Sequence, residues 1–309
     1  MSRYFNRSQR QMMDRALPAA PSKQADLNRV LEEVSQLGIA NEVKRAPVLS
    51  SCRKLRLPVS SDQPLLLAKS SVPEQAIESY RALRTRLMRI QADLKLRSIV
   101  MSSAMAREGK TLTSFNLALS CSRMINYRVL VIDADLRTRG LSRLIGDPSG
   151  PGLSEVLTGK VVEYEDAVMG TENHNLYILS GGRHPGQTSE LFAGTKWKEF
   201  MNWATGNFRL VIVDSPPILP VADFEEIVEC CDGVLMVVRA YQTRRELLKK
   251  TTARLEPKKL IGIILNGLPP TDTAEYKDAY SKAYTAPPTV GDDPDQKTAQ
   301  IARQVETVG

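Results

Sequence analysis

One stretch in the first half of the chain, SSAMAREGKTLTSF at residues 102–115, carries residue types that could bind phosphate. Ala104, four further residues and then Gly-Lys-Thr fit a relaxed form of the loop in which backbone N–H groups surround phosphate oxygens. In such a loop the lysine neutralises phosphate charge, and the threonine hydroxyl can bind Mg²⁺. The residues expected to contact a nucleotide here are Ala104, Arg107, Glu108, Gly109, Lys110, Thr111 and Leu112.

Three aspartates add carboxylate chemistry to this stretch. Asp133 and Asp135 close the apolar run VLVIDAD, and Asp214 closes LVIVD. If both runs are strands of a parallel sheet, their carboxyl ends share one rim with the loop, so all three acids can face one nucleotide and its divalent cation. An aspartate after a strand also commonly caps a helix or begins a turn, which explains any one of them more readily than all three.

The elements that would position these residues follow from the hydrophobic pattern. Short, β-branched apolar runs predict strands buried on both faces at residues 98–103, 128–135, 176–180, 208–217, 233–240 and 260–266. Amphipathic segments separate most of them, and a long amphipathic helix is predicted to begin just after Pro73. We therefore expect an α/β fold, a doubly wound and mostly parallel sheet with right-handed crossovers and flanking helices.

The two ends of the chain differ in composition from this middle part. Residues 1–70 are rich in Arg, Ser, Pro and Gln, which predicts a flexible basic arm with one short helix near residues 27–37. Residues 71–270 are expected to form the folded domain. Residues 271–309 are polar and Pro-rich, which predicts a mobile tail carrying a cluster of tyrosines, Tyr276, Tyr280 and Tyr284.

Charge and cysteine content indicate which kinds of partner to expect and in which cellular compartment the protein works. The 309 residues carry a formal net charge of +7, but without aromatic interleaving, so no nucleic-acid partner is expected. Four cysteines without ligand spacing indicate a reducing compartment, and two histidines leave little for a zinc site. Neither a signal-peptide core nor a membrane-length apolar run is present, so we expect a cytoplasmic protein that reaches the membrane through a partner.

Taken together, the loop and the segments VIDADLR and VIVDSPP resemble the Walker A, A′ and B motifs of bacterial tyrosine kinases, the autokinases of exopolysaccharide and capsule export. The resemblance covers residues 73–285, and the trailing Arg137 belongs to the A′ pattern. Residues 181–192 lie where the family has a Gly-Pro-rich segment, and Asn266 ends its last strand, where it is expected to contact the nucleotide.

The resemblance implies a P-loop NTPase fold and an ATP- and Mg²⁺-dependent tyrosine kinase. It implies that Lys110 neutralises the phosphates, and that Asp133 and Asp135 polarise the incoming phenol and organise the metal. Thr111, Asp133 and Asp214 would hold Mg²⁺, the last through water. The three tail tyrosines would be the phosphoacceptors, phosphorylated in trans between subunits.

The resemblance also implies partners. Glu78, Arg81 and Arg84 reproduce a Glu-x-x-Arg-x-x-Arg helix that in relatives joins subunits into a ring. Their spacing alone equally allows an intrahelical Glu–Arg pair, which contributes only about 0.2 to 0.5 kcal/mol. A membrane adaptor of the polysaccharide co-polymerase (Wzz-like) type and a cognate tyrosine phosphatase are the other partners that the family implies.

Two alternative functions stay open at this point. Partition and positioning ATPases usually carry a second lysine five residues before the invariant one, where this chain has Met105. A catalytically weak, nucleotide-binding scaffold of the export complex is favoured by Arg107, which with Ala106 replaces the family's Pro-Gly. A bulky residue strains or reshapes such a loop wherever the backbone needs a positive φ.

Overall fold

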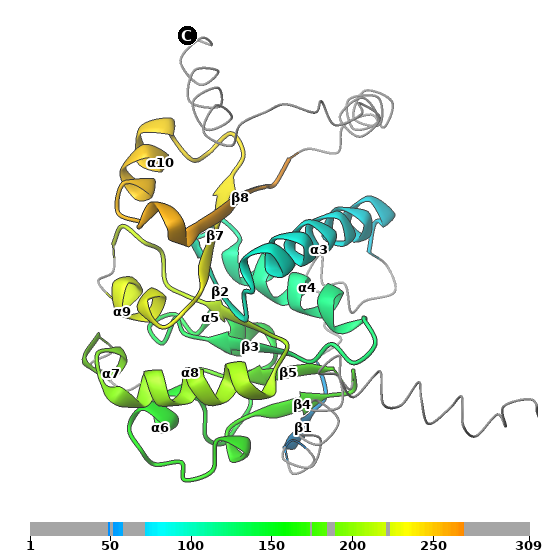
Figure 1. Cartoon of the computed structure of the whole chain (residues 1–309), viewed down its shortest axis with the longest axis vertical. Coiled ribbons are helices and arrows are strands. Elements are labelled where there is room, and N and C mark those ends of the chain that lie inside the picture. Colours follow the sequence, from blue (N-terminus) through cyan, green and yellow to red (C-terminus); the bar gives the residue numbers. More distant parts are fainter. Residues whose placement is uncertain are drawn as a thin grey trace, which may run out of the picture.

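One sheet organises the computed structural model, which describes residues 49, 52–57, 72–173, 175–183, 189–220 and 223–268. Its strands are β1 Arg53–Leu55, β2 Ser98–Ser103, β3 Val129–Asp133, β4 Met169–Thr171, β5 Leu176–Leu179, β6 Leu210–Asp214, β7 Gly233–Arg239 and β8 Leu260–Asn266. They lie in the order β1-β4-β5-β3-β6-β2-β7-β8 (Figure 1). All neighbours from β5 to β8 are parallel, and only the β4–β5 pair is antiparallel among the described strands. The predicted α/β class and mostly parallel sheet are confirmed.

Helices cover both faces of this sheet (Figure 1). One face carries α3 (Glu74–Leu94), α4 (Lys110–Ser122) and α5 (Gly140–Leu144), and the other carries α6 (Leu153–Leu157), α8 (Thr195–Asn207) and α9 (Asp223–Glu229). Successive strand side chains alternate between the faces. In β2, Ile99 and Met101 pack with the α4 cluster, whereas Val100 packs with the α8 cluster. The shorter α7 (Ser189–Phe192) packs against α8 and α9, and α10 (Arg245–Thr252) follows β7.

Six strands lie inside the ranges that the sequence predicts, but β8 differs in burial. It was expected to be buried on both faces, yet Ile263 and Leu265 are 50% and 53% exposed. β8 is the last strand of the sheet and pairs only with β7, so fewer neighbours cover it. β1 and β4 were not predicted, because runs of three residues carry too little periodicity.

The segment around β1 falls within the predicted basic arm, residues 1–70, and belongs to the folded unit. β1 pairs with β4, and Leu49 and Cys52 are buried in the core. The Arg53 guanidinium donates hydrogen bonds to the carbonyl oxygens of Ser149, Pro151 and Asp166 at 2.7, 3.0 and 3.2 Å. The predicted helix near residues 27–37 and the tail 271–309 lie outside the described residues.

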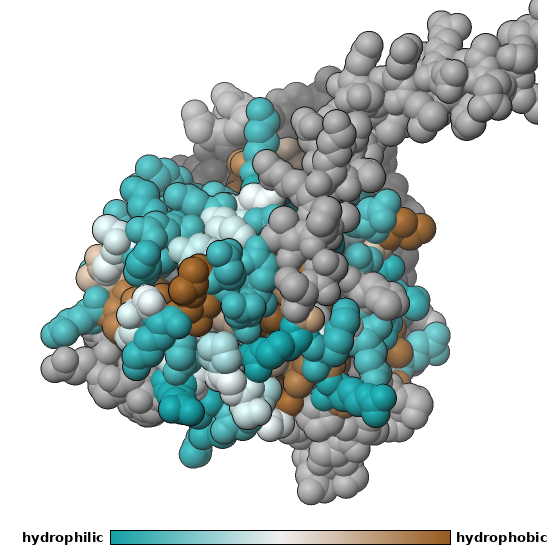
Figure 2. All heavy atoms as spheres, turned by 90° about the horizontal axis from the view of Figure 1, so that it is seen from below, coloured by the Kyte–Doolittle hydropathy of each residue, from teal (hydrophilic) through white to brown (hydrophobic). Residues whose placement is uncertain are grey.

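One face of the molecule is shown by the hydropathy of its residues. The face seen from below in Figure 2 is mainly hydrophilic, with apolar side chains in small separate patches. Among the helices that the structure describes, none is long and apolar enough to cross a bilayer.

The aromatic cluster of α8 provides a test of the fold. Phe200 is fully buried, and its ring lies 5.3 Å from Tyr164 and 5.5 Å from Trp203 between centroids. We expect Phe200→Ala to lower the free energy of unfolding by about 3 to 5 kcal/mol in urea titrations, because it leaves a cavity. The exposed Lys198→Ala on the same helix should change it by less than about 0.5 kcal/mol. Equal effects of the two variants would contradict this packing.

Candidate active site

The phosphate loop connects β2 to α4 at the carboxyl end of the sheet. Lys110 is the first residue of α4, and the residue before it, Gly109, has a φ of +94°. A Cβ at Gly109 would lie 2.0 Å from the Asn266 amide nitrogen, so both the backbone angle and the space require glycine. Arg107 is exposed and has a φ of +68°, a conformation that non-glycine residues adopt at a cost.

Glu108 braces the loop against two other strand ends. Its buried carboxylate accepts hydrogen bonds from the Met105 N–H, at 3.1 Å, and from the Thr243 hydroxyl after β7. Its carbonyl oxygen accepts a hydrogen bond of 2.9 Å from the side-chain amide of Asn266, at the end of β8. The loop conformation is therefore fixed by residues that lie well over a hundred positions away in the chain.

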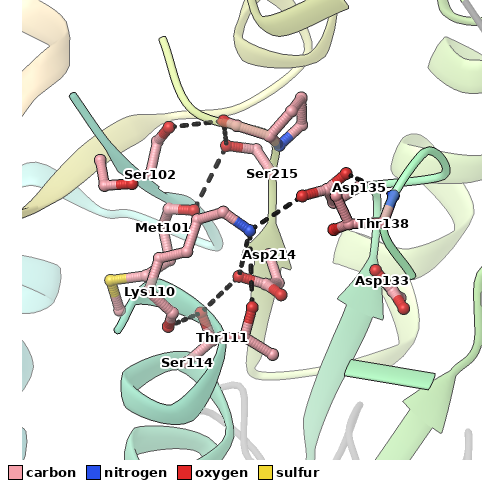
Figure 3. A network of polar contacts seen from close by, with 12 residues as sticks. Met101, Ser102, Lys110, Thr111, Ser114, Asp133, Asp135, Thr138, Asp214 and Ser215 are labelled. Carbon is pink, nitrogen blue, oxygen red and sulfur yellow. Dashed lines mark hydrogen bonds and ion pairs between the residues drawn. The ribbon is translucent and has the colours of Figure 1, made fainter. Parts of the chain in front are cut away.

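The Lys110 ammonium lies between two aspartates (Figure 3). It is 3.1 Å from Asp135 Oδ2, 3.8 Å from Asp214 Oδ1 and 3.4 Å from the Thr111 hydroxyl oxygen. Burial opposes its charge, but Asp214 and Asp135 outweigh burial and raise the pKa of Lys110 above its ordinary value. Burial also opposes the charge of Asp135, yet Lys110 and hydrogen bonds from Thr138 lower the pKa of Asp135. This pair is therefore ionised at neutral pH.

Asp133 and Asp214 form a pair of neighbouring acids beside this ion pair. They are direct neighbours in the register of β3 and β6, and both are fully buried. Asp133 Oδ2 accepts hydrogen bonds from the Ser142 N–H and hydroxyl at 2.7 and 2.6 Å. Burial, reinforced by the charge of Asp214, raises the pKa of Asp133 to about 7. Burial also raises the pKa of Asp214, although Lys110 acts in the opposite direction.

Two carboxylate oxygens at this rim are suited to a cation. Asp133 Oδ1 and Asp214 Oδ2 are buried and have no hydrogen-bond partner in the described part of the chain. Within that part, no cluster of three His, Cys, Asp or Glu side chains forms a self-contained metal site. Mg²⁺ at nucleotide sites is commonly held by one or two carboxylates together with phosphate oxygens, so these residues fit it as a nucleotide-bound ion.

The structure places the other predicted site residues as follows. Ala104 is fully buried under the loop, and Leu112 is partly buried. Arg137 forms an ion pair with Asp223 at 3.2 Å. The contacts recorded for the described residues do not include one between Arg137 and Asp135 or Asp214. Asn266 contacts the loop backbone, and its contact with a nucleotide stays a prediction. The tail tyrosines and residues 184–188 lie outside the described residues.

The Glu-x-x-Arg-x-x-Arg residues of α3 make contacts of two kinds. Glu78 and Arg81 are half-exposed and form an ion pair within the helix. Arg84 instead donates a hydrogen bond of 2.8 Å to the carbonyl oxygen of Ser120 on α4. The ring interface thus stays a prediction, in which Glu78 and Arg81 would exchange partners more readily than Arg84.

Known proteins are similar to this chain in sequence and in fold. No protein-family model matches the chain. The tyrosine-protein kinase YwqD of Bacillus subtilis (strain 168) is 33% identical over 201 residues, which cover 64% of this chain and 84% of YwqD. The chain belongs to the bacterial tyrosine-protein kinases. The putative tyrosine-protein kinase CapB of Staphylococcus aureus is 27% identical over 207 residues, covering 66% of this chain and 90% of CapB.

A solved structure supports the same family. The kinase domain of the Escherichia coli tyrosine kinase ETK superposes with a TM-score of 0.63 at 28% sequence identity, over 71% of this chain and 91% of that domain. This bacterial tyrosine kinase accordingly has the P-loop NTPase fold that its motifs predict.

Several residues of the candidate site were not predicted from the sequence. The Ser114 hydroxyl lies 3.2 Å from Asp214 Oδ1, one helical turn after Lys110, and that spacing could have suggested it. Ser142 binds Asp133 and also accepts a hydrogen bond of 2.9 Å from the Gly181 N–H. Thr243 reaches the loop, and Gly181 reaches Ser142, from distant segments, so only the folded chain reveals these contacts.

Arg107 allows a test of loop strain. Arg107→Val should weaken nucleotide binding and lower the free energy of unfolding by about 1 to 2 kcal/mol, because a β-branched residue tolerates a φ of +68° least. Arg107→Gly, which removes the strain, should bind nucleotide at least as tightly as the parent. Calorimetric titration with a nucleotide analogue and urea unfolding would measure both effects. Tighter nucleotide binding by the valine variant than by the glycine variant would show that the backbone at position 107 is not strained.

Asp133 gives the kinase a defined pH dependence of stability. The folded state keeps the Asp133 proton up to about pH 7, whereas the unfolded chain releases it at about pH 4. The free energy of unfolding should therefore fall as pH rises through this window, by up to about 1.4 kcal/mol per pH unit. Asp133→Asn should flatten this decline and exceed the parent in stability above pH 7, in urea titrations with EDTA. An unchanged slope would show that Asp133 is not the responsible group.

Proposed function

We propose that this kinase uses ATP to phosphorylate its own tyrosines Tyr276, Tyr280 and Tyr284 in trans, and so regulates the polymerisation and export of exopolysaccharide or capsule. The observation that carries the proposal is the position of Lys110, 3.1 Å from Asp135 and 3.8 Å from Asp214 at the start of α4. Phosphoryl transfer depends mainly on positioning and on neutralising phosphate charge. An ammonium, backbone N–H groups and carboxylates at one rim meet those needs.

Lys110 and Asp135 have complementary tasks in this proposal. Lys110 stays protonated, because its pKa is raised, and so can neutralise the phosphates at the N-terminus of α4. When Lys110 turns to a phosphate, its ion pair with Asp135 weakens and the Asp135 carboxylate becomes available to the substrate. The phenol of tyrosine has a pKa of about 10 and must lose its proton as the bond to phosphorus forms. In this proposal Asp135 orients that phenol and accepts the proton.

The remaining acids are suited to the metal. Mg²⁺, when bound, neutralises charge on the phosphate oxygens. Thr111 and the free oxygens of Asp214 and Asp133 would hold it, directly or through water. Ser142 donates a hydrogen bond to Asp133 Oδ2, so only Oδ1 of Asp133 remains to bind the ion.

We place this activity in a larger assembly. The residues Glu78 and Arg81, half-exposed on α3, would join copies of the chain into a ring, and this would bring a tail within reach of a neighbouring site. The kinase would lie in the cytoplasm at the inner face of the plasma membrane, held by a Wzz-like adaptor of the polysaccharide co-polymerase type. A cognate tyrosine phosphatase would reverse the modification. The similarity to CapB and YwqD supports the tyrosine-kinase activity that this assembly would contain.

Autophosphorylation by the purified chain tests the proposal. The parent protein with Mg²⁺ and ATP should acquire phosphotyrosine on the tail, and Lys110→Ala should lower the rate by about 100- to 1,000-fold because the phosphate charge is no longer neutralised. The matched control Lys196→Ala, an exposed lysine on α8, should retain the parent rate. Immunoblotting and peptide mass spectrometry would measure the products.

Mixing experiments separate trans from cis transfer. A Lys110→Ala chain with an intact tail should be phosphorylated by an active chain whose three tail tyrosines are Phe. Labelling that occurs only within active chains would contradict transfer in trans. ATP binding without any phosphotyrosine would support the nucleotide-binding scaffold instead.

A further inference from the structure

Tyr241 differs from the other tyrosines that the structure describes in its accessibility. It is 88% exposed, whereas Tyr80, Tyr127, Tyr164 and Tyr177 are partly buried. Burial is the main cause that raises the phenol pKa of three of them, Tyr80, Tyr127 and Tyr177. The fourth, Tyr164, packs against the rings of α8. A tyrosine must present its hydroxyl to an in-line phosphate to be phosphorylated, and in the described part of the chain Tyr241 is the tyrosine that does so.

The position of Tyr241 relates it to the kinase site. It follows β7 at the carboxyl rim of the sheet, the rim that also carries the phosphate loop. Two residues later, the Thr243 hydroxyl contacts the Glu108 carboxylate of that loop. Lys110 is 7% exposed, so a side chain as exposed as that of Tyr241 does not enter the site of its own chain. A second copy of the chain is therefore the source of the phosphate.

The backbone holds Tyr241 outward at an energetic cost. Its φ is +60°, which is unusual for an aromatic residue. The turn is fixed by the Gln242 and Thr243 N–H groups, which donate to the Arg239 carbonyl oxygen at 3.2 and 3.0 Å, and by the Arg239 N–H, which donates to the Thr243 hydroxyl at 3.0 Å. Strain that the surrounding hydrogen bonds maintain is concentrated at functional positions in proteins.

The charges around Tyr241 favour the product of phosphorylation. Arg244, Arg245, Lys249 and Lys250 follow it within ten residues and are exposed, and Glu246 is the acid among them. A phosphate on Tyr241 adds about −1.5 to −2 charges at neutral pH. The four basic residues would stabilise that charge, and they would also attract an approaching anionic partner.

We infer that Tyr241 is a phosphoacceptor of this kinase, phosphorylated by the site of a second copy of the chain. The inference rests on the proposed autokinase function and adds a substrate outside the tail. In the transfer, a bond forms between the Tyr241 phenol oxygen and the γ-phosphorus of ATP, the bond from that phosphorus to the β–γ bridging oxygen breaks, and ADP leaves. The phenol proton passes to a carboxylate of the donor site and then to water.

The test uses the full chain with Tyr276, Tyr280 and Tyr284 all changed to Phe. Incubated with Mg²⁺ and ATP and digested, this triple variant should give a phosphopeptide that contains Tyr241. Adding Tyr241→Phe should remove the phosphotyrosine from this peptide, whereas adding the matched control Tyr164→Phe, which keeps the ring packing of α8, should leave it. In the parent background, Tyr241→Phe should leave phosphorylation of the tail unchanged, which shows that the variant is folded and active.

The source of the phosphate is tested by mixing. The triple variant with Lys110→Ala added serves as acceptor, and an active chain that lacks Tyr241 and the tail tyrosines serves as donor. Phosphate on the Tyr241 of the acceptor, at a rate that rises with donor concentration, is the expected result. A parent chain that labels its tail while the triple variant stays unlabelled at Tyr241 would overturn the inference and leave the proposed function standing. Absence of phosphotyrosine from every chain, the parent included, would overturn both.

Discussion

The buried ammonium of Lys110 is the interaction on which the rest of the site depends. A charge at this depth is stable only with close partners of opposite sign, and the chain supplies them from two separate strands, through Asp135 after β3 and Asp214 at the end of β6. The ion pairs thereby connect α4 to the centre of the sheet. Because buried ion pairs contribute little net stability, their arrangement is better explained by what an ammonium and carboxylates can do together at this rim.

The carboxylates are more numerous than the single ammonium can satisfy. Asp133 lies beside Asp214 in the register, and each keeps one buried oxygen without a hydrogen-bond partner among the described residues. Burial raises the pKa of both acids, and for Asp133 the charge of Asp214 adds to this effect. Such a local conflict persists where function requires it, and a divalent cation carrying phosphate would resolve it.

The phosphate loop combines rigidity with strain. Glu108 ties it to the ends of β7 and β8 through Thr243 and Asn266, so its backbone is held by the sheet. That bracing explains how Arg107 is held at a positive φ, since the neighbouring contacts determine the backbone. The side chain of Arg107 is exposed, so this departure from the family pattern lies at the surface of the loop.

The sequence by itself determined the local elements and the composition of the site. Continuous apolar runs predicted six parallel strands, and the positions of Lys110, Asp135 and Asp214 after them predicted one shared rim, because parallel strands end on the same side. It did not predict β1 or β4, whose pairing depends on distant partners, or the exposure of β8 at the sheet edge. Only the tertiary structure decided which oxygen each acid leaves free and that Thr243 and Asn266 hold the phosphate loop, because hydrogen bonds between residues far apart in the chain leave no periodic pattern in the sequence.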